Sequence, residues 1–367
     1  MEVNFYNSDT KESAGPLAAM FANNHEQVLF CQDKEIGLKA IIAIHNTTLG
    51  PALGGTRMWN YSSEQEALND VLRLSRGMTY KSSVAGVNLG GGKAVIIGDS
   101  KKDKSEALFR RFGKFVNSLG GKYITAEDVG ISPKDIEQVA IETDYVTGAP
   151  EYLGGSGDPS PVTAYGVYMG MKAAAKKAYG SDSLEGKKVL VQGVGHVGYY
   201  LVEYLTKENA KVLVADIYEP NVAAVVKDFN CQVVHPENVY DEPMDIYAPC
   251  ALGATVNDET LKKLKCSIIA GAANNQLASE DIHGQALKNA GILYAPDYVI
   301  NSGGIINCYW ELQGYDRDAA YSQTKEIYST TLEIFNKSEN KNIPTYLAAN
   351  QMAEERIIAI GKVKLSY

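Results

Sequence analysis

The second half of this chain contains the segment Lys188-Val-Leu-Val-Gln-Gly-Val-Gly-His-Val-Gly198, from which its fold can be inferred. Its valine-rich start predicts a strand over 188–192, and the glycines that follow have the GxGxxG spacing of a turn that opens a helix. A second strand is predicted over 211–215 and ends in Asp216, at about the distance of 20 residues that a dinucleotide-binding motif requires. Because strand, turn, helix and acidic residue all occur in order, the motif is specific here, whereas GxGxxG alone is common.

The glycine-rich turn is expected to hold the pyrophosphate of a dinucleotide. Gly193 permits the tight turn, Gly195 lets the pyrophosphate approach the backbone, and Gly198 allows close packing of helix on strand. The helix that starts here offers unpaired N–H groups and the positive end of its dipole. His196 and Val197 complete the predicted cofactor-binding loop, in which His196 has no catalytic role.

Asp216 is expected to choose the cofactor. At the end of the second strand, its carboxylate would accept hydrogen bonds from the ribose hydroxyls of the adenosine and would repel a 2′-phosphate. No arginine stands directly beside it to reverse that preference. The sequence therefore predicts NAD as the cofactor rather than NADP.

The second half continues as an alternation of strands and helices. Further apolar strands are predicted at 246–248, 266–270 and 292–295. This order is typical of an α/β fold with a doubly wound, Rossmann-type parallel sheet. The run of glycine and proline from Gly154 to Pro161 interrupts regular structure and predicts a linker between two domains, 1–150 and 151–342.

The first half is predicted to hold a second, smaller α/β arrangement. A hairpin is expected over 27–45, and a helix over 63–77 begins with the capping box of Ser63 and Glu66. The remaining elements are strands at 84–87 and 94–97 on either side of a glycine-rich turn, a helix over 105–119 and a strand over 123–125.

The glycine-rich turn carries the chemistry of the first half. Lys93 ends Gly86-Val-Asn-Leu-Gly-Gly-Gly-Lys93, Lys81 precedes it, and Asp128 follows the strand over 123–125. All three are expected at strand edges around one cleft. Exclusion from water disfavours an ammonium, so a lysine held here would have a lowered pKa and could act as a base. A phosphate-binding P-loop is excluded, because that motif requires other residues at positions 87 and 94.

Bulk composition limits the other possibilities. The 367 residues carry a net charge of −9, and basic residues are not clustered, which argues against a nucleic-acid partner. Five dispersed cysteines predict reduced thiols and no metal site. No signal peptide and no membrane-spanning run is evident, so the expected location is the cytoplasm.

With these residues identified, the chain resembles the amino acid dehydrogenases of the glutamate, leucine, phenylalanine and valine group, and most closely their leucine branch. The resemblance extends from about Glu26 to Arg356. It is carried by seven motifs in the same order: Thr47 to Trp59, Gly77 to Lys81, Asn88 to Lys93, Thr125 to Gly130, Pro159 to Gly166, Ala273 to Leu277 and Ala295 to Gly304.

The resemblance implies reversible, NAD-dependent oxidative deamination of an L-amino acid to a 2-oxo acid and ammonia. It implies that Lys81 binds the substrate carboxylate, that Lys93 activates water and polarises the carbonyl, and that Asp128 exchanges protons with the substrate nitrogen. Thr163 and Asn274 would lie against the nicotinamide, and Asn274 would also be within reach of the substrate carboxylate.

The resemblance also defines a side-chain pocket of Leu53, Gly54, Ala126, Ile305 and Cys308. The glutamate branch has a lysine where this chain has Leu53, and a glutamate side chain buried there without a partner would cost several kcal/mol. The apolar lining favours the branched aliphatic substrates leucine, isoleucine and valine. One methylene is worth only about 1–3 kcal/mol, so no order among these three is predicted.

Three alternatives remain at this point: a phenylalanine-specific member of the family, a non-catalytic NAD-binding sensor, and a hydroxy acid dehydrogenase. The sensor is disfavoured because Lys93 and Asp128 are both present, and the hydroxy acid enzyme because no histidine lies in a suitable motif. The resemblance further implies that the first domain binds substrate and forms a homo-oligomer, a dimer or an octamer. Residues 343–367 would fold back onto that domain.

Overall fold

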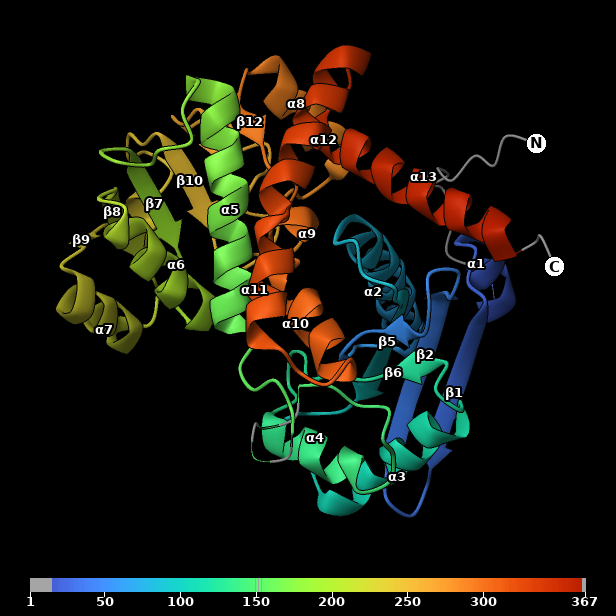
Figure 1. The fold of residues 1–367 in the computed structure, drawn as a ribbon. Helices are drawn as coiled ribbons and strands as arrows, with labels where there is room; N and C mark the ends of the chain where they lie inside the picture. Colours follow the sequence, from blue (N-terminus) through green and yellow to red (C-terminus); the bar gives the residue numbers. More distant parts are fainter. Residues whose placement is uncertain (1–14, 149, 151, 153, 365–367) are drawn as a thin grey trace. The chain divides into compact units, whose positions relative to one another are not determined.

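The structure, a computed structural model, describes residues 15–148, 150, 152 and 154–364. Two compact units can be distinguished (Figure 1). The first contains the chain up to Gly157, Glu311–Tyr315 and the residues from Arg356 onward, and the second contains Asp158–Trp310 and Asp316–Glu355. The domain limits given above, 150/151 and 342/343, stay predictions.

The second unit is built on a six-stranded sheet in the order β12-β11-β10-β7-β8-β9, and every described pair in it is parallel. Numbered within the unit, this order is 3-2-1-4-5-6 read from β9, the doubly wound arrangement in which ligands bind beyond the carboxyl ends of the strands. The strands are β7 (Lys188–Gln192), β8 (Lys211–Ala215), β9 (Gln232–Val233), β10 (Ile246–Pro249), β11 (Ile268–Ile269) and β12 (Leu293–Tyr294).

The second unit also contains helices, of which α13 continues from Arg356 onward into the first unit. The first of them, α5, ends at Gly180, whose left-handed backbone conformation at φ 78° is typical of a helix C-terminus. The helices are α5 (Ser160–Tyr179), α6 (His196–Lys207), α7 (Glu219–Phe229), α8 (Glu280–Asn289), α9 (Asp297–Ile300), α10 (Gly303–Leu312), α11 (Arg317–Lys325), α12 (Ile327–Lys341) and α13 (Thr345–Lys364).

The first unit contains a mixed six-stranded sheet in the order β1-β2-β5-β3-β6, with β4 also paired to β5. Strands β3 and β4 both run parallel to β5 in one continuous register, so they form a single line that is interrupted at Gly54-Gly55. The elements are α1 (Pro16–Ala22), β1 (Gln27–Asp33), β2 (Leu38–Asn46), β3 (Ala52–Leu53), β4 (Thr56–Trp59), α2 (Glu64–Val84), β5 (Gly90–Ile97), α3 (Glu106–Ser118), β6 (Tyr123–Ile124) and α4 (Pro133–Ala140).

The two faces of this sheet are covered by different helices. Ala94 belongs to a buried cluster with the apolar residues of α3, whereas its neighbour Val95 belongs to a cluster with those of α2. Because side chains alternate between the faces of a strand, Lys93 shares the α2 face with Val95. Leu53 of β3 and Arg57 of β4 lie on this face too, because they pair in register with Gly91 and Val95 of β5.

Two elements differ from the predictions for the first half. Residues 84–87 are not a strand, because α2 continues to Val84, past the predicted end at Gly77. Helices tolerate one glycine at a cost of about 1 kcal/mol, and the buried face of α2 outweighs it. Lys81 therefore lies in the last turn of a helix rather than at the edge of a strand.

The glycines before Lys93 are also not a turn, because Gly90–Gly92 form the start of β5. A Cβ atom at Gly91 would lie 2.1 Å from the Thr79 nitrogen, and one at Gly92 would lie 2.7 Å from the Tyr123 ring. These glycines thus allow α2 and β6 to pack directly against the strand, which a local sequence pattern does not reveal.

Two buried histidines lie between the sheet and α2. His25 Nε2 is 2.9 Å from Ser75 Oγ, His45 Nδ1 is 2.8 Å from Thr79 Oγ1, and the ring centroids are 4.8 Å apart. Burial lowers the pKa of His25 to about 4, and burial together with the neighbouring His25 lowers the pKa of His45 to about 3.

We expect this pair to make the protein sensitive to acid. Neutral histidine is favoured in the folded state, so its stabilising contribution is present above pH 6.5 and is lost as the pH falls toward 4 and 3, by about 3 kcal/mol for His25. The melting temperature should therefore fall between pH 7.5 and pH 4.5. The double variant His25→Gln/His45→Asn, which keeps a nitrogen near each contact, should show a smaller fall, and an equal fall would contradict this assignment.

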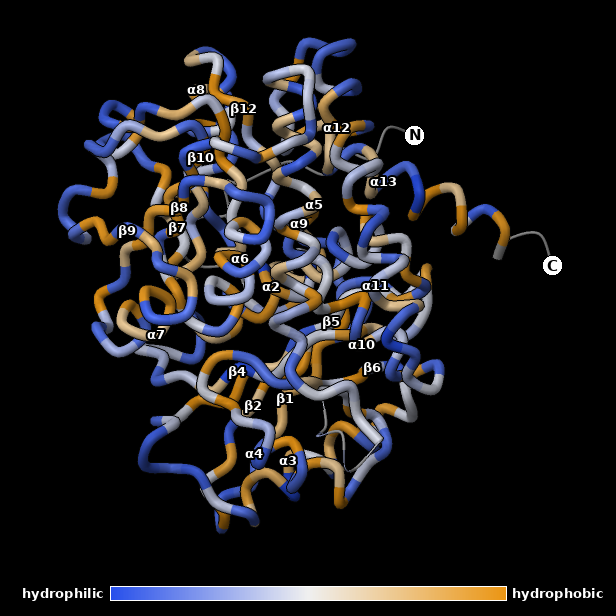
Figure 2. The backbone as a smooth tube through the Cα atoms, turned by 60° about the vertical axis from the view of Figure 1, so that its left-hand side comes forward, coloured by the Kyte–Doolittle hydropathy of each residue, from blue (hydrophilic) through white to orange (hydrophobic). Residues whose placement is uncertain are grey.

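Several apolar side chains of the first unit are exposed. They include Phe21 on α1, which is 91% exposed, Phe30 on the edge strand β1, and Ile358 and Val363 on α13. Figure 2 shows hydrophobic and hydrophilic residues alternating along the end of α13. Within the described part of the chain, no helix combines the length and apolar character needed to cross a membrane.

Candidate active site

The site in the first unit is shaped by Gly55, which stands beside Lys93 in the strand register. A Cβ atom at Gly55 would lie 2.2 Å from the Glu127 carbonyl oxygen and 3.1 Å from Asp128 Cβ. The segment after β6 can therefore lie directly on the sheet only because this position has no side chain. The result is that Asp128 is placed over the strand next to Lys93.

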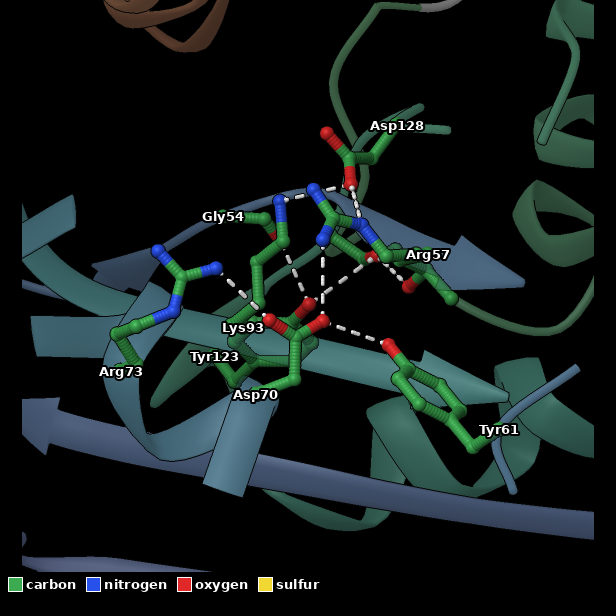
Figure 3. Close-up of polar contacts among 10 residues, drawn as sticks. Gly54, Arg57, Tyr61, Asp70, Arg73, Lys93, Tyr123 and Asp128 are labelled. Carbon is green, nitrogen blue, oxygen red and sulfur yellow. Dashed lines mark hydrogen bonds and ion pairs between the residues drawn. The ribbon is translucent and has the colours of Figure 1, made fainter. Parts of the chain in front are cut away.

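Lys93 and Asp128 form an ion pair in which Nζ and Oδ2 are 3.2 Å apart (Figure 3). Lys93 is only 6% exposed, while the side chain of Asp128 is 24% exposed. The same Oδ2 atom accepts a hydrogen bond of 2.9 Å from Arg57 Nε. A buried amine and a partly accessible carboxylate thus lie within one hydrogen-bonded group.

The environment lowers the pKa of both groups. Burial disfavours the Lys93 ammonium and lowers its pKa, and Arg57 adds to this effect, although Asp128 opposes it. Burial disfavours the Asp128 carboxylate, but the positive charges of Lys93 and Arg57 outweigh burial and hold the pKa of Asp128 below its ordinary value. An amine that loses its proton easily beside an ionised carboxylate can perform general acid–base catalysis.

Strands β3 and β4, which lie beneath the site, are joined by hydrogen bonds to β6 and the residue that follows it. Tyr123 donates a hydrogen bond of 2.5 Å to the Gly54 carbonyl oxygen, and burial raises the pKa of its hydroxyl. On the same line, Thr56 Oγ1 is 2.6 Å from Thr125 Oγ1. These contacts hold the Gly54-Gly55 interruption in place, and with it the position of Lys93.

The other predicted residues of the first unit are placed around this pair. Leu53 is buried on the face that carries Lys93, and Ala126 is buried two residues before Asp128. Gly54 stands between Leu53 and Gly55, where a Cβ atom would lie 1.8 Å from the Gly92 carbonyl oxygen. Lys81 is half-buried at the end of α2.

In the second unit, the loop between β7 and α6 has the features that a pyrophosphate requires. Gly193 has φ 95°, and a Cβ atom there would lie 2.7 Å from the Ala251 nitrogen. At Gly198 a Cβ atom would lie 2.1 Å from the Gly193 carbonyl oxygen. Around Gly195, in contrast, the space that a Cβ atom would enter is open, and no side chain caps the helix that begins at His196.

Asp216 follows β8 and is bound to this loop. Its Oδ2 accepts a hydrogen bond of 2.8 Å from the Val194 nitrogen, and its Oδ1 accepts one of 2.9 Å from the Tyr218 nitrogen. The carboxylate therefore stands next to the open helix N-terminus at the carboxyl edge of the parallel sheet. The residues present fit a bound dinucleotide, since they offer backbone N–H groups to its phosphates and a carboxylate to its ribose.

The remaining predicted residues also belong to the second unit. Thr163 lies in the first turn of α5 and donates a hydrogen bond of 2.9 Å to the Pro159 carbonyl oxygen. Asn274 is exposed in the loop after β11, and its Oδ1 accepts a hydrogen bond of 2.7 Å from Asn301. Ile305 is buried and Cys308 half-buried, nearly one turn apart on α10.

The sequence interpretation missed three residues of these two groups. Arg57 and Asp70 form an ion pair of 3.0 Å next to Lys93 and Asp128. Asn301 is 3% exposed, and its Oδ1 has no hydrogen-bond partner among the described residues. Arg57 and Asn301 stand inside the motifs that carried the resemblance, which was the available signal, whereas nothing in its local sequence distinguishes Asp70.

Comparison with known proteins finds relatives over most of the chain. The pattern described as the Glu/Leu/Phe/Val dehydrogenase dimerisation domain matches residues 25–145, and that of the Glutamate/Leucine/Phenylalanine/Valine dehydrogenases matches 154–218 and 216–364. The leucine dehydrogenase of Thermoactinomyces intermedius is 58% identical over 344 residues, 94% of each chain. The phenylalanine dehydrogenase of Caldalkalibacillus thermarum is 49% identical over 340 residues, 91% of this chain and 92% of that one.

A solved structure of an amino acid dehydrogenase is also similar to this chain. The L-tryptophan dehydrogenase from Nostoc punctiforme superposes with a TM-score of 0.82 at 46% identity, over 94% of this chain and 99% of that one. The chain belongs to the Glu/Leu/Phe/Val dehydrogenase family. It is an amino acid dehydrogenase, an oxidoreductase with a nicotinamide dinucleotide cofactor, so the predicted family, α/β fold and type of activity are confirmed.

Proposed function

We propose that this protein is an NAD-dependent leucine dehydrogenase that converts leucine, and also isoleucine and valine, reversibly to the 2-oxo acid and ammonia. One observation carries the proposal: the buried amine of Lys93 and the carboxylate of Asp128 share a sheet face with the apolar side chain of Leu53. The relatives named leucine dehydrogenase, at 57–59% identity, give further support.

In this proposal three residues of the first unit carry out the reaction. Lys81 binds the substrate carboxylate through its ammonium group. Asp128 accepts a proton from the substrate ammonium, which leaves an amine whose Cα–H bond can release hydride. The bound cofactor supplies the hydride acceptor. The iminium ion that results is attacked by water, and neutral Lys93 takes up the proton that the water loses.

The carbinolamine formed by that attack must lose ammonia. Asp128, protonated in the first step, returns a proton to the nitrogen. As the C–N bond breaks and the carbonyl of the 2-oxo acid forms, the hydroxyl proton passes to the departing ammonia, which leaves as ammonium. Lys93 then carries one proton more than at the start and releases it to solvent. The position of Asp128 beside Lys93, at 3.2 Å, allows both groups to act on one carbon centre.

In the second unit we propose that Gly193, Gly195, His196, Val197 and Gly198 bind the pyrophosphate. Asp216 would accept hydrogen bonds from the adenosine ribose, which supports NAD rather than NADP, because a 2′-phosphate would stand against its negative charge.

At the nicotinamide end we propose contacts with Thr163 and Asn274. Asn301 is added to the residues inferred from the sequence, since its side-chain amide donates a hydrogen bond to Asn274 Oδ1 and so orients Asn274.

For the substrate side chain we propose a pocket of Leu53, Gly54, Ala126, Ile305 and Cys308. Leu53 and Ala126 are buried and apolar, so a branched aliphatic chain gains free energy there, whereas a carboxylate would lose its hydration without a partner. The alternative is a phenylalanine dehydrogenase, which the same pocket would support if it extends beyond Cys308.

The proposal is tested by measuring NADH formation at alkaline pH with L-leucine, L-isoleucine, L-valine, L-phenylalanine and L-glutamate, each with NAD and with NADP. We expect fast turnover of the three branched substrates with NAD alone. Preference for phenylalanine would replace the substrate assignment, and comparable rates with NADP would refute the role of Asp216. Bound NAD without turnover of any substrate would favour a sensor.

We also propose a homo-oligomer in the cytoplasm. The first part of the family pattern is described as a dimerisation domain, and the exposed Phe21, Phe30 and Val363 are apolar residues of the kind that interfaces cover. The five cysteines are all free, as expected in a reducing compartment. Sedimentation analysis would distinguish a dimer from an octamer.

A further inference from the structure

Arg57 connects two carboxylates that are far apart in the sequence. Its Nε donates a hydrogen bond of 2.9 Å to Asp128 Oδ2, and its Nη1 donates one of 3.0 Å to Asp70 Oδ2 (Figure 3). The Arg57 side chain is 22% exposed, so both pairs are largely shielded from water. None of the roles assigned above uses this residue.

Asp70 is itself held in place, which makes it an anchor for Arg57. Tyr61 donates a hydrogen bond of 2.7 Å to Asp70 Oδ2, and Arg73 donates one of 2.9 Å to Asp70 Oδ1. Because the guanidinium is planar and its donors have fixed directions, binding to Asp70 restricts where Nε can point. The orientation of Arg57 toward Asp128 is thus set before a substrate arrives.

The two arginines and two aspartates around Lys93 have no net charge when Lys93 is left out. The cations Arg57 and Arg73 offset the carboxylates Asp70 and Asp128, so that a proton on Lys93 leaves one excess positive charge. If Arg57 were absent, Lys93 would be the cation that pairs with Asp128. A buried ion pair of that kind would hold the ammonium firmly.

From this geometry we infer that Arg57 is a positioning residue: anchored by Asp70, it fixes the carboxylate of Asp128 and neutralises its charge, so that Lys93 is not confined to an ion pair. This inference rests on the proposed function, in which neutral Lys93 is the base. Among the described residues of the first unit, Arg57 and Asp70 act on Lys93, and Arg57, Tyr61 and Tyr123 act on Asp128. Arg73 is paired with Asp70. Removal of Arg57 eliminates the nearest of the cations.

The variants for the test are Arg57→Met, which removes the charge, and Arg57→Lys, which keeps it. In wild type the rate should rise with pH as Lys93 loses its proton. In Arg57→Met we expect the midpoint of this rise in kcat/KM to move to higher pH by about one unit, with about tenfold lower activity below the midpoint. Arg57→Lys should recover most of the shift.

Arg110→Met is the matched control. Arg110 also binds two carboxylates, Glu106 and Glu142, but it belongs to α3, on the opposite face of the sheet. The midpoint should be unchanged in this variant. A uniform loss of activity in Arg57→Met at every pH, without a shift, would indicate a purely structural role and would overturn the inference, as would unchanged activity.

A second measurement does not depend on turnover. The purified proteins, without substrate or cofactor, are treated with trace acetic anhydride at a series of pH values, and acetylation of Lys93 is quantified by mass spectrometry. Labelling of Lys93 should require higher pH in Arg57→Met than in wild type, and identical profiles would overturn the inference. If wild type oxidises no amino acid in the panel, the proposed function fails, while this measurement still tests Arg57.

Discussion

Lys93→Ala is expected to lower the turnover of L-leucine by about 10⁴-fold, since loss of a general base alone costs about 10²- to 10⁴-fold and Lys93 also polarises the carbonyl. The amine is 6% exposed and its pKa is lowered by burial, so neutral Lys93 should become available below the ordinary lysine pKa of about 10.4. The wild-type rate should accordingly rise with pH through a midpoint below that value.

The measurement is steady-state NADH formation together with NAD binding, followed by fluorescence. NAD binding should be unchanged, because the residues proposed to bind it belong to the second unit. Lys39→Ala removes an exposed lysine of the same sheet, paired with Glu64, and should have nearly wild-type turnover. An active Lys93→Ala variant would refute the proposed role of this amine.

Asp128→Asn is expected to lower turnover by about 10³-fold, because the amide has almost the same size but cannot take up the proton of the substrate ammonium. Asp128→Asn should change the pKa of Lys93 in the opposite direction to Arg57→Met. Asp128 raises the pKa of Lys93, so its neutralisation should lower that pKa further and shift the acid limb of the residual activity to lower pH.

The pH profile of Asp128→Asn therefore checks the electrostatic arrangement, and its rate checks the catalytic role. Glu127→Gln neutralises the preceding carboxylate, to which no role is assigned, and should reduce activity by less than tenfold. Residual activity of Asp128→Asn within tenfold of wild type would exclude Asp128 as the essential acceptor of the ammonium proton.

The second unit was the easier one to predict, since a parallel sheet buried on both faces leaves a local signature. The strands expected at 188–192 and 211–215 are β7 and β8 without change, and those at 246–248, 266–270 and 292–295 coincide with β10, β11 and β12 to within two residues at either end. Only β9 was not expected, and its two residues are both exposed.

The first unit was harder to predict, because its glycines are required by contacts with segments that are distant in the sequence. Gly91 and Gly92 looked like a turn, yet they form a strand whose missing side chains make room for α2 and Tyr123. The link from Asp70 through Arg57 to Asp128 joins residues far apart in the chain, so no local pattern could have indicated it. Lys93 and Asp128, in contrast, stood within motifs and were predicted as partners.

The close approaches at Gly54 and Gly55 have a practical consequence for redesign of the substrate range. Any side chain at these positions would collide with backbone carbonyl oxygens, at 1.8 Å and 2.2 Å for the first carbon alone. A combinatorial library should therefore leave both codons untouched and randomise Leu53 and Ala126. Such a library would sample variants for new amino acid substrates, while every variant keeps the arrangement of the Lys93 amine and the Asp128 carboxylate.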